Sequence, residues 1–163
     1  MKNKITDKLF ELAYTDSMTE VQNRNAYEER LKKLRKPNAN ISRITVVVVD
    51  VNVNGLKEIN DSYGHFCGDD AIKTVAKALK DTLGEKADIF RIGGDEFVCI
   101  SESNVLPYIS QFKDTISFID REKLYKLAVS IGYSRFHEKY SKVIDDIICR
   151  ADEKMYKDKK SKK

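Results

Sequence analysis

The sequence predicts an α/β fold in which a single mixed sheet carries helices, within one domain of 163 residues. Three observations lead to this class. The β-branched run Ile44–Val51 has the composition of a strand buried on both faces. Two short apolar segments flank Gly93-Gly94, which is typical of a β-hairpin. Segments with helical periodicity separate the strands and give the order β-α-α-β-β-α-β-α after a helical lead.

The chain begins with two helical segments. Residues 2–13 are polar and read as a helical lead, and residues 22–35 carry apolar side chains at helical spacing. The strand Ile44–Val51 follows and ends before Asn54-Gly55, a dipeptide that favours a turn. A short helix is therefore expected at 56–61.

A longer helix is expected at 69–83, where the apolar residues form one stripe. Residues 88–92 and 96–100 are the hairpin strands, and they must be antiparallel. The remaining elements are expected to be a helix at 105–119, a strand at 127–133 and a closing helix at 141–158. The first strand, the two helices after it and the second strand then form a crossover unit.

The composition excludes several classes of protein. Hydrophobic residues make up 41% and charged residues 34%, so a folded core is expected rather than disorder. The longest apolar stretch is strand-sized, which argues against membrane insertion, and a net charge of +4 does not predict a nucleic-acid partner. The three cysteines are far apart in sequence, as expected of reduced thiols in a cytoplasmic protein.

The hairpin carries the most informative chemistry. Asp95 and Glu96 follow two glycines, whose lack of side chains lets a phosphate group approach the backbone closely. Neighbouring residues on a strand project to opposite sides, so one carboxylate can hold a metal ion while the other has a different role. The competing interpretation is a solvated Gly-Gly-Asp turn, and turn chemistry alone favours it.

Five segments in order resemble the GGDEF family, the diguanylate cyclases. The signature itself is Gly93-Gly94-Asp95-Glu96-Phe97, and the segment from Gly55 to Asp69 is similar to the family's second block. Weaker matches are the opening turn at residues 16–24, the strand at 130–132 and the last helix at 151–156. The resemblance covers residue 16 to the end of the chain.

The resemblance implies a nucleotide-cyclase or polymerase-palm-like fold with about five strands around the GGDEF hairpin. It implies that residues 16–163 form one domain and that residues 1–15 are the end of a helical connector from an upstream sensor. The implied reaction condenses two GTP molecules into cyclic di-GMP and releases pyrophosphate. It needs Mg²⁺ or Mn²⁺ and a homodimer, because each domain holds one GTP and provides half of the active site.

Carried over residue by residue, the resemblance makes Asp95 and Glu96 the catalytic carboxylates, with Asp95 also a metal ligand. Asn60 and Asp69 would read the guanine edge, since a carboxylate accepts from both N1–H and N2–H₂ of guanine. His65 lies in the same block.

The phosphates would meet backbone N–H groups of Gly55 and Leu56 at a helix start. Lys159 matches a phosphate-contacting lysine, although a solvated tail charge is an equal alternative for it. Six lysines against three acidic residues in 151–163 account for +3 of the net charge, so the basicity is concentrated near this position.

The first metal carboxylate departs from the family pattern. Counting back from Lys57 without a gap places Asn52 at the metal position and Val53 at the carbonyl ligand that follows. A neutral Asn would remove one negative charge from the site. The alternative is a two-residue insertion that makes Asp50 the ligand. The ungapped register is favoured because short β-to-α loops rarely carry insertions.

Further departures concern the opening turn, the product-inhibition motif and the tail. Glu20 stands where the family usually has Gly, which predicts either a different backbone conformation or strain. Gly84 and Ala87 replace the Arg and Asp of the RxxD motif, so no inhibitory site is expected. Lys163 would replace the tail arginine as a point charge. A degenerate domain that binds GTP without turnover is the alternative function, and a purely dimerising domain is a third.

Overall fold

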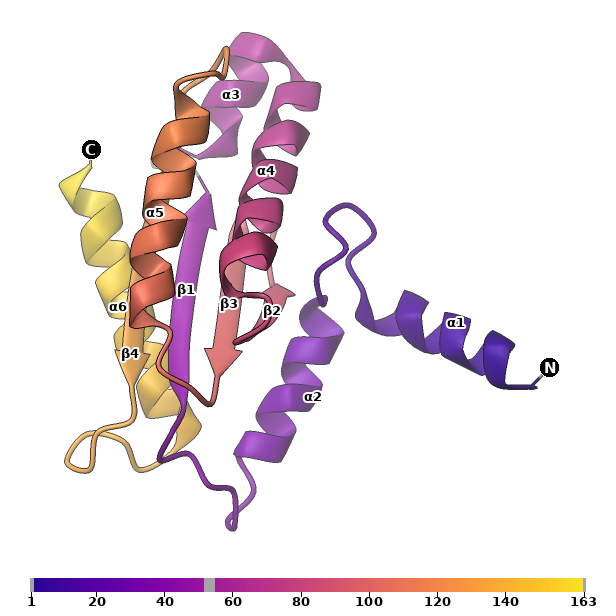
Figure 1. Ribbon diagram of the computed structural model, residues 1–163, viewed down its shortest axis with the longest axis vertical. Coiled ribbons are helices and arrows are strands. Elements are labelled where there is room, and N and C mark those ends of the chain that lie inside the picture. Colours follow the sequence, from indigo (N-terminus) through magenta and orange to yellow (C-terminus); the bar gives the residue numbers. More distant parts are fainter. Residues whose placement is uncertain (1, 52–54, 163) are drawn as a thin grey trace.

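The computed structural model describes residues 2–51 and 55–162, with six helices and four strands among them (Figure 1). The elements in chain order are α1 (Lys2–Tyr14), α2 (Arg24–Leu34), β1 (Thr45–Val51), α3 (Leu56–Tyr63), α4 (His65–Leu83), β2 (Asp88–Arg91), β3 (Glu96–Ser101), α5 (Leu106–Asp120), β4 (Val129–Arg135) and α6 (Ile144–Ser161). None of the helices in these described ranges is long and apolar enough to cross a membrane.

The four strands form one sheet in the order β2-β3-β1-β4, and each pair of neighbours is antiparallel. The strands β1 and β2 therefore run in the same direction on either side of β3, as the predicted crossover requires. On the outer edge of β2, Phe90 forms an isolated parallel bridge with Gln22. This bridge attaches the segment before α2 to the edge of the sheet.

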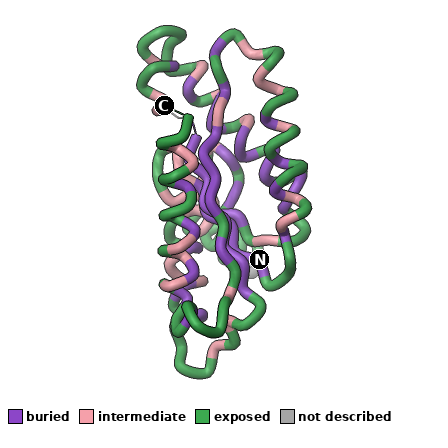
Figure 2. Tube along the Cα trace, turned by 90° about the vertical axis from the view of Figure 1, so that its left-hand side faces the viewer, coloured by how far each residue is buried: buried purple, intermediate pink, exposed green. Residues whose placement is uncertain are grey.

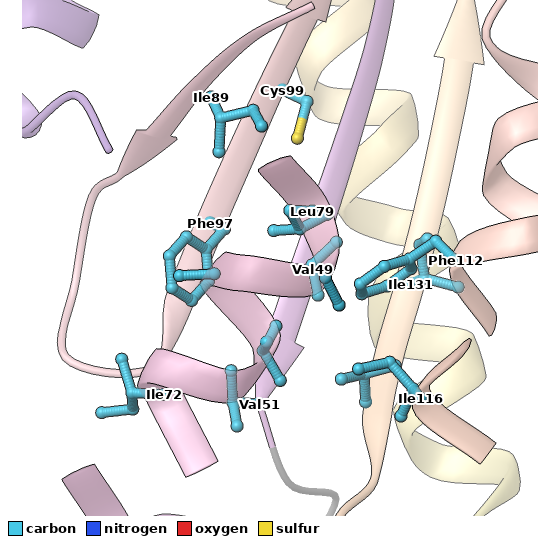
Figure 3. Close-up of a cluster of buried hydrophobic side chains, with 14 of the residues drawn as sticks. Val49, Val51, Ile72, Leu79, Ile89, Phe97, Cys99, Phe112, Ile116 and Ile131 are labelled. Carbon is cyan, nitrogen blue, oxygen red and sulfur yellow. The ribbon is translucent and has the colours of Figure 1, made fainter. Parts of the chain in front are cut away.

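Strand β1 is buried along its whole length because helices cover both faces of the sheet (Figures 1 and 2). Its odd-numbered residues Val47, Val49 and Val51 belong to a cluster with side chains of α4 and α5, which Figure 3 shows around Phe97 and Leu79. Its even-numbered residues Val46 and Val48 belong to a second cluster with side chains of α2 and α6. This two-sided burial explains why the strand is continuously apolar.

The alternation along the strands also orients the polar residues at their ends. Asp50 shares the parity of Val46 and Val48, and Glu96 shares that of Val98, which lies in the same cluster. Both carboxylates therefore project toward the face that α6 covers. The C-terminal helix thus provides the surroundings of these two groups.

Helix α6 packs unusually closely on β4. A Cβ atom added at Gly132 would lie under 3.0 Å from the carbonyl oxygen of Ala151 and the amide nitrogen of Met155. At the far end of the helix, Asp158 Oδ2 accepts a hydrogen bond from Ile131 N at 2.9 Å, and Lys162 Nζ donates to the carbonyl oxygen of Val129 at 2.8 Å. Close backbone packing and these two side chains together fix the helix on the strand.

The α/β class is confirmed, and the differences from the expected elements are local. The sheet has four named strands where about five were expected, and all neighbours are antiparallel where a mixed sheet was expected. Helix α4 begins at His65 and not at residue 69. Gly64, with a φ of 87°, separates it from α3, and α4 starts directly after this glycine. The first turn of α4 has no apolar stripe, so periodicity could not locate it.

The substitution Gly132→Ala is expected to lower the free energy of unfolding by about 2–3 kcal/mol, since the new methyl group meets helix backbone that cannot rotate away. Chemical denaturation would measure this. Gly94→Ala is the matched control, because nothing lies within 4 Å of the added Cβ there. Equal effects of the two substitutions would show that α6 can move away from β4 at little cost.

Candidate active site at the hairpin and the end of β1

Three of the charged residues singled out in the sequence lie together at the C-terminal end of β1. Asp50 is paired with Glu96 in the β1–β3 register, and Val51 N donates a hydrogen bond to the carbonyl oxygen of Asp95 at 2.8 Å. Lys159 of α6 contacts Asp50, with Nζ 3.1 Å from Oδ1 and 3.0 Å from Oδ2. The side chains of Asp50 and Lys159 are 11% and 23% exposed, so water screens this ion pair little.

Glu96 lies in an environment that disfavours its charged form. Burial raises the pKa of Glu96 above its ordinary value, and the nearby carboxylates of Asp152, Asp50 and Asp95 raise it further, while Lys159 opposes them. The carboxylates of Asp152, Asp50 and Asp95 thus act together on Glu96, and the ammonium group of Lys159 opposes them only in part. Such an arrangement favours binding of an additional cation.

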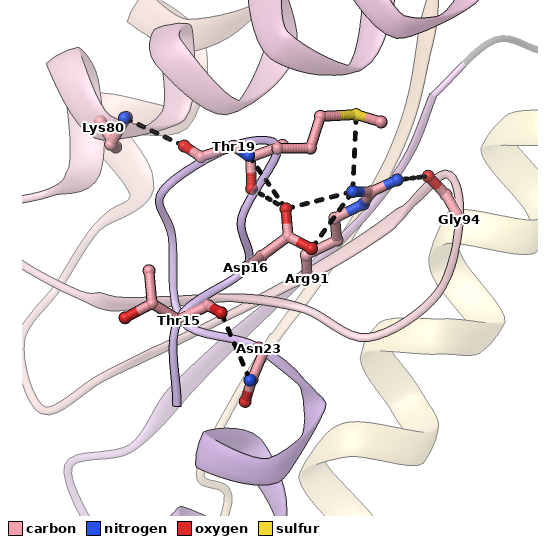
Figure 4. Close-up of polar contacts among 8 residues, drawn as sticks. Thr15, Asp16, Thr19, Asn23, Lys80, Arg91 and Gly94 are labelled. Atoms are coloured by element: carbon pink, nitrogen blue, oxygen red, sulfur yellow. Dashed lines mark hydrogen bonds and ion pairs between the residues drawn. The ribbon is translucent and has the colours of Figure 1, made fainter. Parts of the chain in front are cut away.

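The hairpin that carries Asp95 and Glu96 is held by Arg91 (Figure 4). The guanidinium of Arg91 donates to both carboxylate oxygens of Asp16, at 3.2 and 3.1 Å, and to the carbonyl oxygen of Gly94 at 2.8 Å. Asp16 Oδ2 also accepts from the backbone N–H and the hydroxyl of Thr19, at 3.0 and 2.6 Å. Burial raises the pKa of Asp16, but the hydrogen bonds from Thr19 and Arg91 outweigh burial and lower it overall.

The opening turn around Thr19 has a strained backbone, which is one of the two outcomes expected for Glu20. Glu20 has a φ of 61° and is the one non-glycine residue with positive φ in the described part of the chain. The backbone therefore has a conformation that glycine adopts freely, and holding a Glu there costs about 1–2 kcal/mol. Lys80 is tied to this turn, since its Nζ donates to the carbonyl oxygen of Thr19 at 3.1 Å.

The residues expected to read a base lie on the two helices after β1. Asn60 is half-buried on α3, and Asp69 and His65 are exposed on α4. The two helices approach most closely at Gly68, where an added Cβ would lie under 3.0 Å from Asn60 Oδ1. Gly68 is therefore needed for Asn60 to keep this side-chain position.

The start of α3 leaves backbone donors free of side-chain capping. Gly55 is the N-cap residue with a φ of 84°, no side chain forms a cap hydrogen bond there, and Leu56 begins the helix. The uncapped N–H groups and the helix dipole together favour an anion at this end. Phosphate contact at Gly55 and Leu56 stays a prediction.

Of the other predicted site positions, Asn52 and Val53 lie outside the described residues. Gly84 and Ala87, at the positions of the RxxD motif, bring no charged side chains to that place. Among residues 2–51 and 55–162, no group of three or more His, Cys, Asp or Glu side chains could hold a metal ion on its own.

Sequence reasoning did not identify three residues of this region: Asp152, Asp16 and Arg91. Asp152 lies within the last-helix motif, but its proximity to Glu96 depends on how α6 packs on the sheet. Asp16 lies in the opening turn and Arg91 in the first hairpin strand, and no local pattern predicts that they form an ion pair across 75 positions.

Comparison with known proteins gives a family for this arrangement. Residues 13–163 match the family described as "Diguanylate cyclase, GGDEF domain". The chain is 29% identical over 155 residues to the probable diguanylate cyclase DgcI of Escherichia coli K12, covering 94% of this chain and 33% of DgcI. It is 30% identical over 173 residues to a diguanylate cyclase of Vibrio cholerae, covering 97% of this chain and 50% of that protein. The chain thus spans a third to a half of the length of these relatives.

Solved structures have the same fold. The crystal structure of the coiled coil and GGDEF domain of DgcB from Caulobacter crescentus, in complex with c-di-GMP, has a TM-score of 0.79 at 21% identity, covering 98% of this chain and 87% of that one. Diguanylate cyclase SiaD from Pseudomonas aeruginosa, in complex with its activator SiaC, also has a TM-score of 0.79, at 22% identity, covering 99% of this chain and 64% of SiaD.

The raised pKa of Glu96 predicts a pH-dependent stability difference between the wild type and Glu96→Gln. The folded state retains the Glu96 proton to higher pH than the unfolded state, so ionisation costs the wild type stability as pH rises from about 4 toward 7. The variant should therefore gain melting temperature relative to the wild type at pH 7 and lose this advantage near pH 4. Thermal denaturation at both pH values measures the difference.

Glu138→Gln is the control for this experiment, since Glu138 is an exposed carboxylate outside the hairpin. A stability difference between Glu96→Gln and the wild type that stays constant from pH 4 to 7 would contradict the assigned environment of Glu96.

Proposed function

Because this chain belongs to the GGDEF family of diguanylate cyclase domains, we propose that it condenses two GTP molecules into cyclic di-GMP with release of pyrophosphate. The observation that carries the proposal is the grouping of Asp50, Glu96 and Lys159 at the signature hairpin. Each half-reaction joins a 3′-hydroxyl to an α-phosphate. Such chemistry needs positioning and charge neutralisation and no covalent nucleophile.

The donor set fits a divalent cation such as Mg²⁺ or Mn²⁺. Such ions prefer carboxylate and carbonyl oxygens and often take only one or two carboxylates from the protein, with substrate phosphates as further ligands. Asp50 and Glu96 offer two carboxylates from paired positions on adjoining strands, and Asp95 precedes Glu96 on the hairpin. Burial and then the neighbouring carboxylates raise the pKa of Glu96, and a bound cation would stabilise the charged form of Glu96 against both. When bound, the metal would neutralise charge on the phosphates.

Asp50 is the first-strand ligand that we favour over Asn52. Asp50 faces the same side of the sheet as Glu96, and its Oδ2 atom lies 3.0 Å from Lys159 Nζ. The carboxylate of Asp50 thus already binds one positive charge, the ammonium group of Lys159. This corresponds to the register with a two-residue insertion between the first metal ligand and Lys57. The proposal therefore reverses the preference derived from loop lengths.

The remaining roles follow the same pattern. Lys159, together with the backbone N–H groups of Gly55 and Leu56, would contact the phosphates. Asn60 and Asp69 would read the guanine edge, with His65 nearby. Asp95 and Glu96 would assist removal of the proton from the attacking hydroxyl.

The reaction requires a second copy of the domain, because one copy would hold one GTP. We therefore propose a homodimer as the active form, with an upstream sensor domain preceding α1 and controlling the encounter. Helix α1 projects from the body of the domain, which suits a connecting segment (Figure 1).

Incubation of the purified protein with GTP and Mg²⁺ or Mn²⁺ should yield cyclic di-GMP, detected by chromatography. The rate per chain should rise with protein concentration, since the active form is dimeric. Tight GTP binding with no product at high protein concentration would instead establish a binding module. Absence of both binding and product would refute the proposed function.

The same assay distinguishes the two metal registers. Asp50→Asn should lower the rate of cyclic di-GMP formation by at least about 100-fold, because a charged ligand of the cation is lost. Asn52→Ala, the matched control, should stay within about threefold of the wild type. A large gain of activity in Asn52→Asp, with Asp50→Asn tolerated, would establish the ungapped register.

A further inference from the structure

Asp70, the residue after the proposed base-reading Asp69, is the centre of a polar cluster that the proposed function does not use. Its Oδ2 accepts hydrogen bonds from the hydroxyl of Tyr125 at 2.6 Å and from Lys123 Nζ at 2.5 Å. Both partners lie in the loop between α5 and β4, more than 50 positions along the chain. Lys123 Nζ also lies 5.7 Å from the centre of the Tyr125 ring, so the loop side chains contact each other.

The cluster keeps its charges and donors at neutral pH. Burial raises the pKa of Asp70, but the hydrogen bonds from Lys123 and Tyr125 outweigh burial and lower it overall, so Asp70 remains a carboxylate acceptor. Burial, followed by the bond to Asp70, raises the pKa of Tyr125, so its hydroxyl remains a donor. Tyr125 is itself buried, and its ring lies 6.4 Å from that of Tyr63 at the end of α3.

The start of α4 requires such an anchor because it has no cap of its own. Gly64 precedes the helix with no side-chain cap hydrogen bond, and no acidic residue lies in its first turn. An uncapped helix end frays, and fraying here would move Asp69, which is only one turn into the helix. The neighbours of Asp69 are held on both sides: Gly68 lies against Asn60 of α3, and Asp70 is bound to the α5–β4 loop.

We infer that Asp70 and Tyr125 are positioning residues for guanine recognition, which fix the second turn of α4 so that Asp69 meets the N1–H and N2–H₂ donors of the base. The inference rests on the proposed function and adds residues that act through Asp69. Lys123 supports them through its ion pair with the carboxylate of Asp70. Specificity for guanine thus depends in part on Tyr125 of the α5–β4 loop, which acts through Asp70.

The test compares binding of GDP and IDP, which differ only in the exocyclic amino group and lack the pyrophosphate leaving group of the reaction. Wild-type protein should bind GDP more tightly than IDP by calorimetry. Tyr125→Phe should weaken GDP binding about fivefold and IDP binding less than twofold, because the contact to the amino group suffers most. Asp70→Asn should show the same pattern, and hydrogen exchange of residues 65–70 should accelerate in both variants.

Tyr108→Phe is the matched control, since it removes a tyrosine hydroxyl from α5 outside the cluster, and it should change neither affinity. Equal weakening of GDP and IDP in Tyr125→Phe would indicate a merely structural role and overturn the inference, as would no weakening of either. Both results leave the proposed function intact. Wild-type protein that fails to distinguish GDP from IDP would instead overturn the proposed base reading, and this inference with it.

Discussion

The position of the signature hairpin depends on the guanidinium of Arg91. Gly93 and Gly94 have no side chains with which to hold the turn, and Arg91 supplies the missing contacts by binding the Gly94 carbonyl and the carboxylate of Asp16. The planar fork of an arginine suits two such acceptors, and a lysine in its place would lose this geometry. Since Asp16 is also bound by Thr19, the strained opening turn and the hairpin form one connected unit. The orientation of Asp95 and Glu96 follows from this unit.

The charged groups around that hairpin are arranged so that the ionised form of Glu96 is disfavoured. Burial disfavours the charge of Glu96, the carboxylates of Asp152, Asp50 and Asp95 disfavour it further, and Lys159 offsets only part of this cost. Such an environment lowers the stability of the folded state. Residues of this kind are common at functional sites, where binding or catalysis and not stability determines the residue type.

The sequence predicted the parts of this molecule that local physics determines. The continuous β-branched composition of β1, the Gly-Gly hairpin and the amphipathic stripe of α4 each specify an element within a few residues. Contacts between distant segments were not predictable in this way: the proximity of Asp152 to Glu96 and the binding of Asp70 by Tyr125 depend on tertiary packing. The sequence also could not decide between Asp50 and Asn52 as the metal ligand, because residues two apart on a regular strand project to the same side.

The last turn of α6 has a consequence for how two copies of this domain can meet. Strand β4 lies at the edge of the sheet, where unpaired N–H and C=O groups ordinarily invite an additional strand. Asp158 and Lys162 already bind Ile131 N and the Val129 carbonyl, so a strand from another molecule would have to displace both side chains. Extension of the sheet from one copy into the next is therefore disfavoured at this edge.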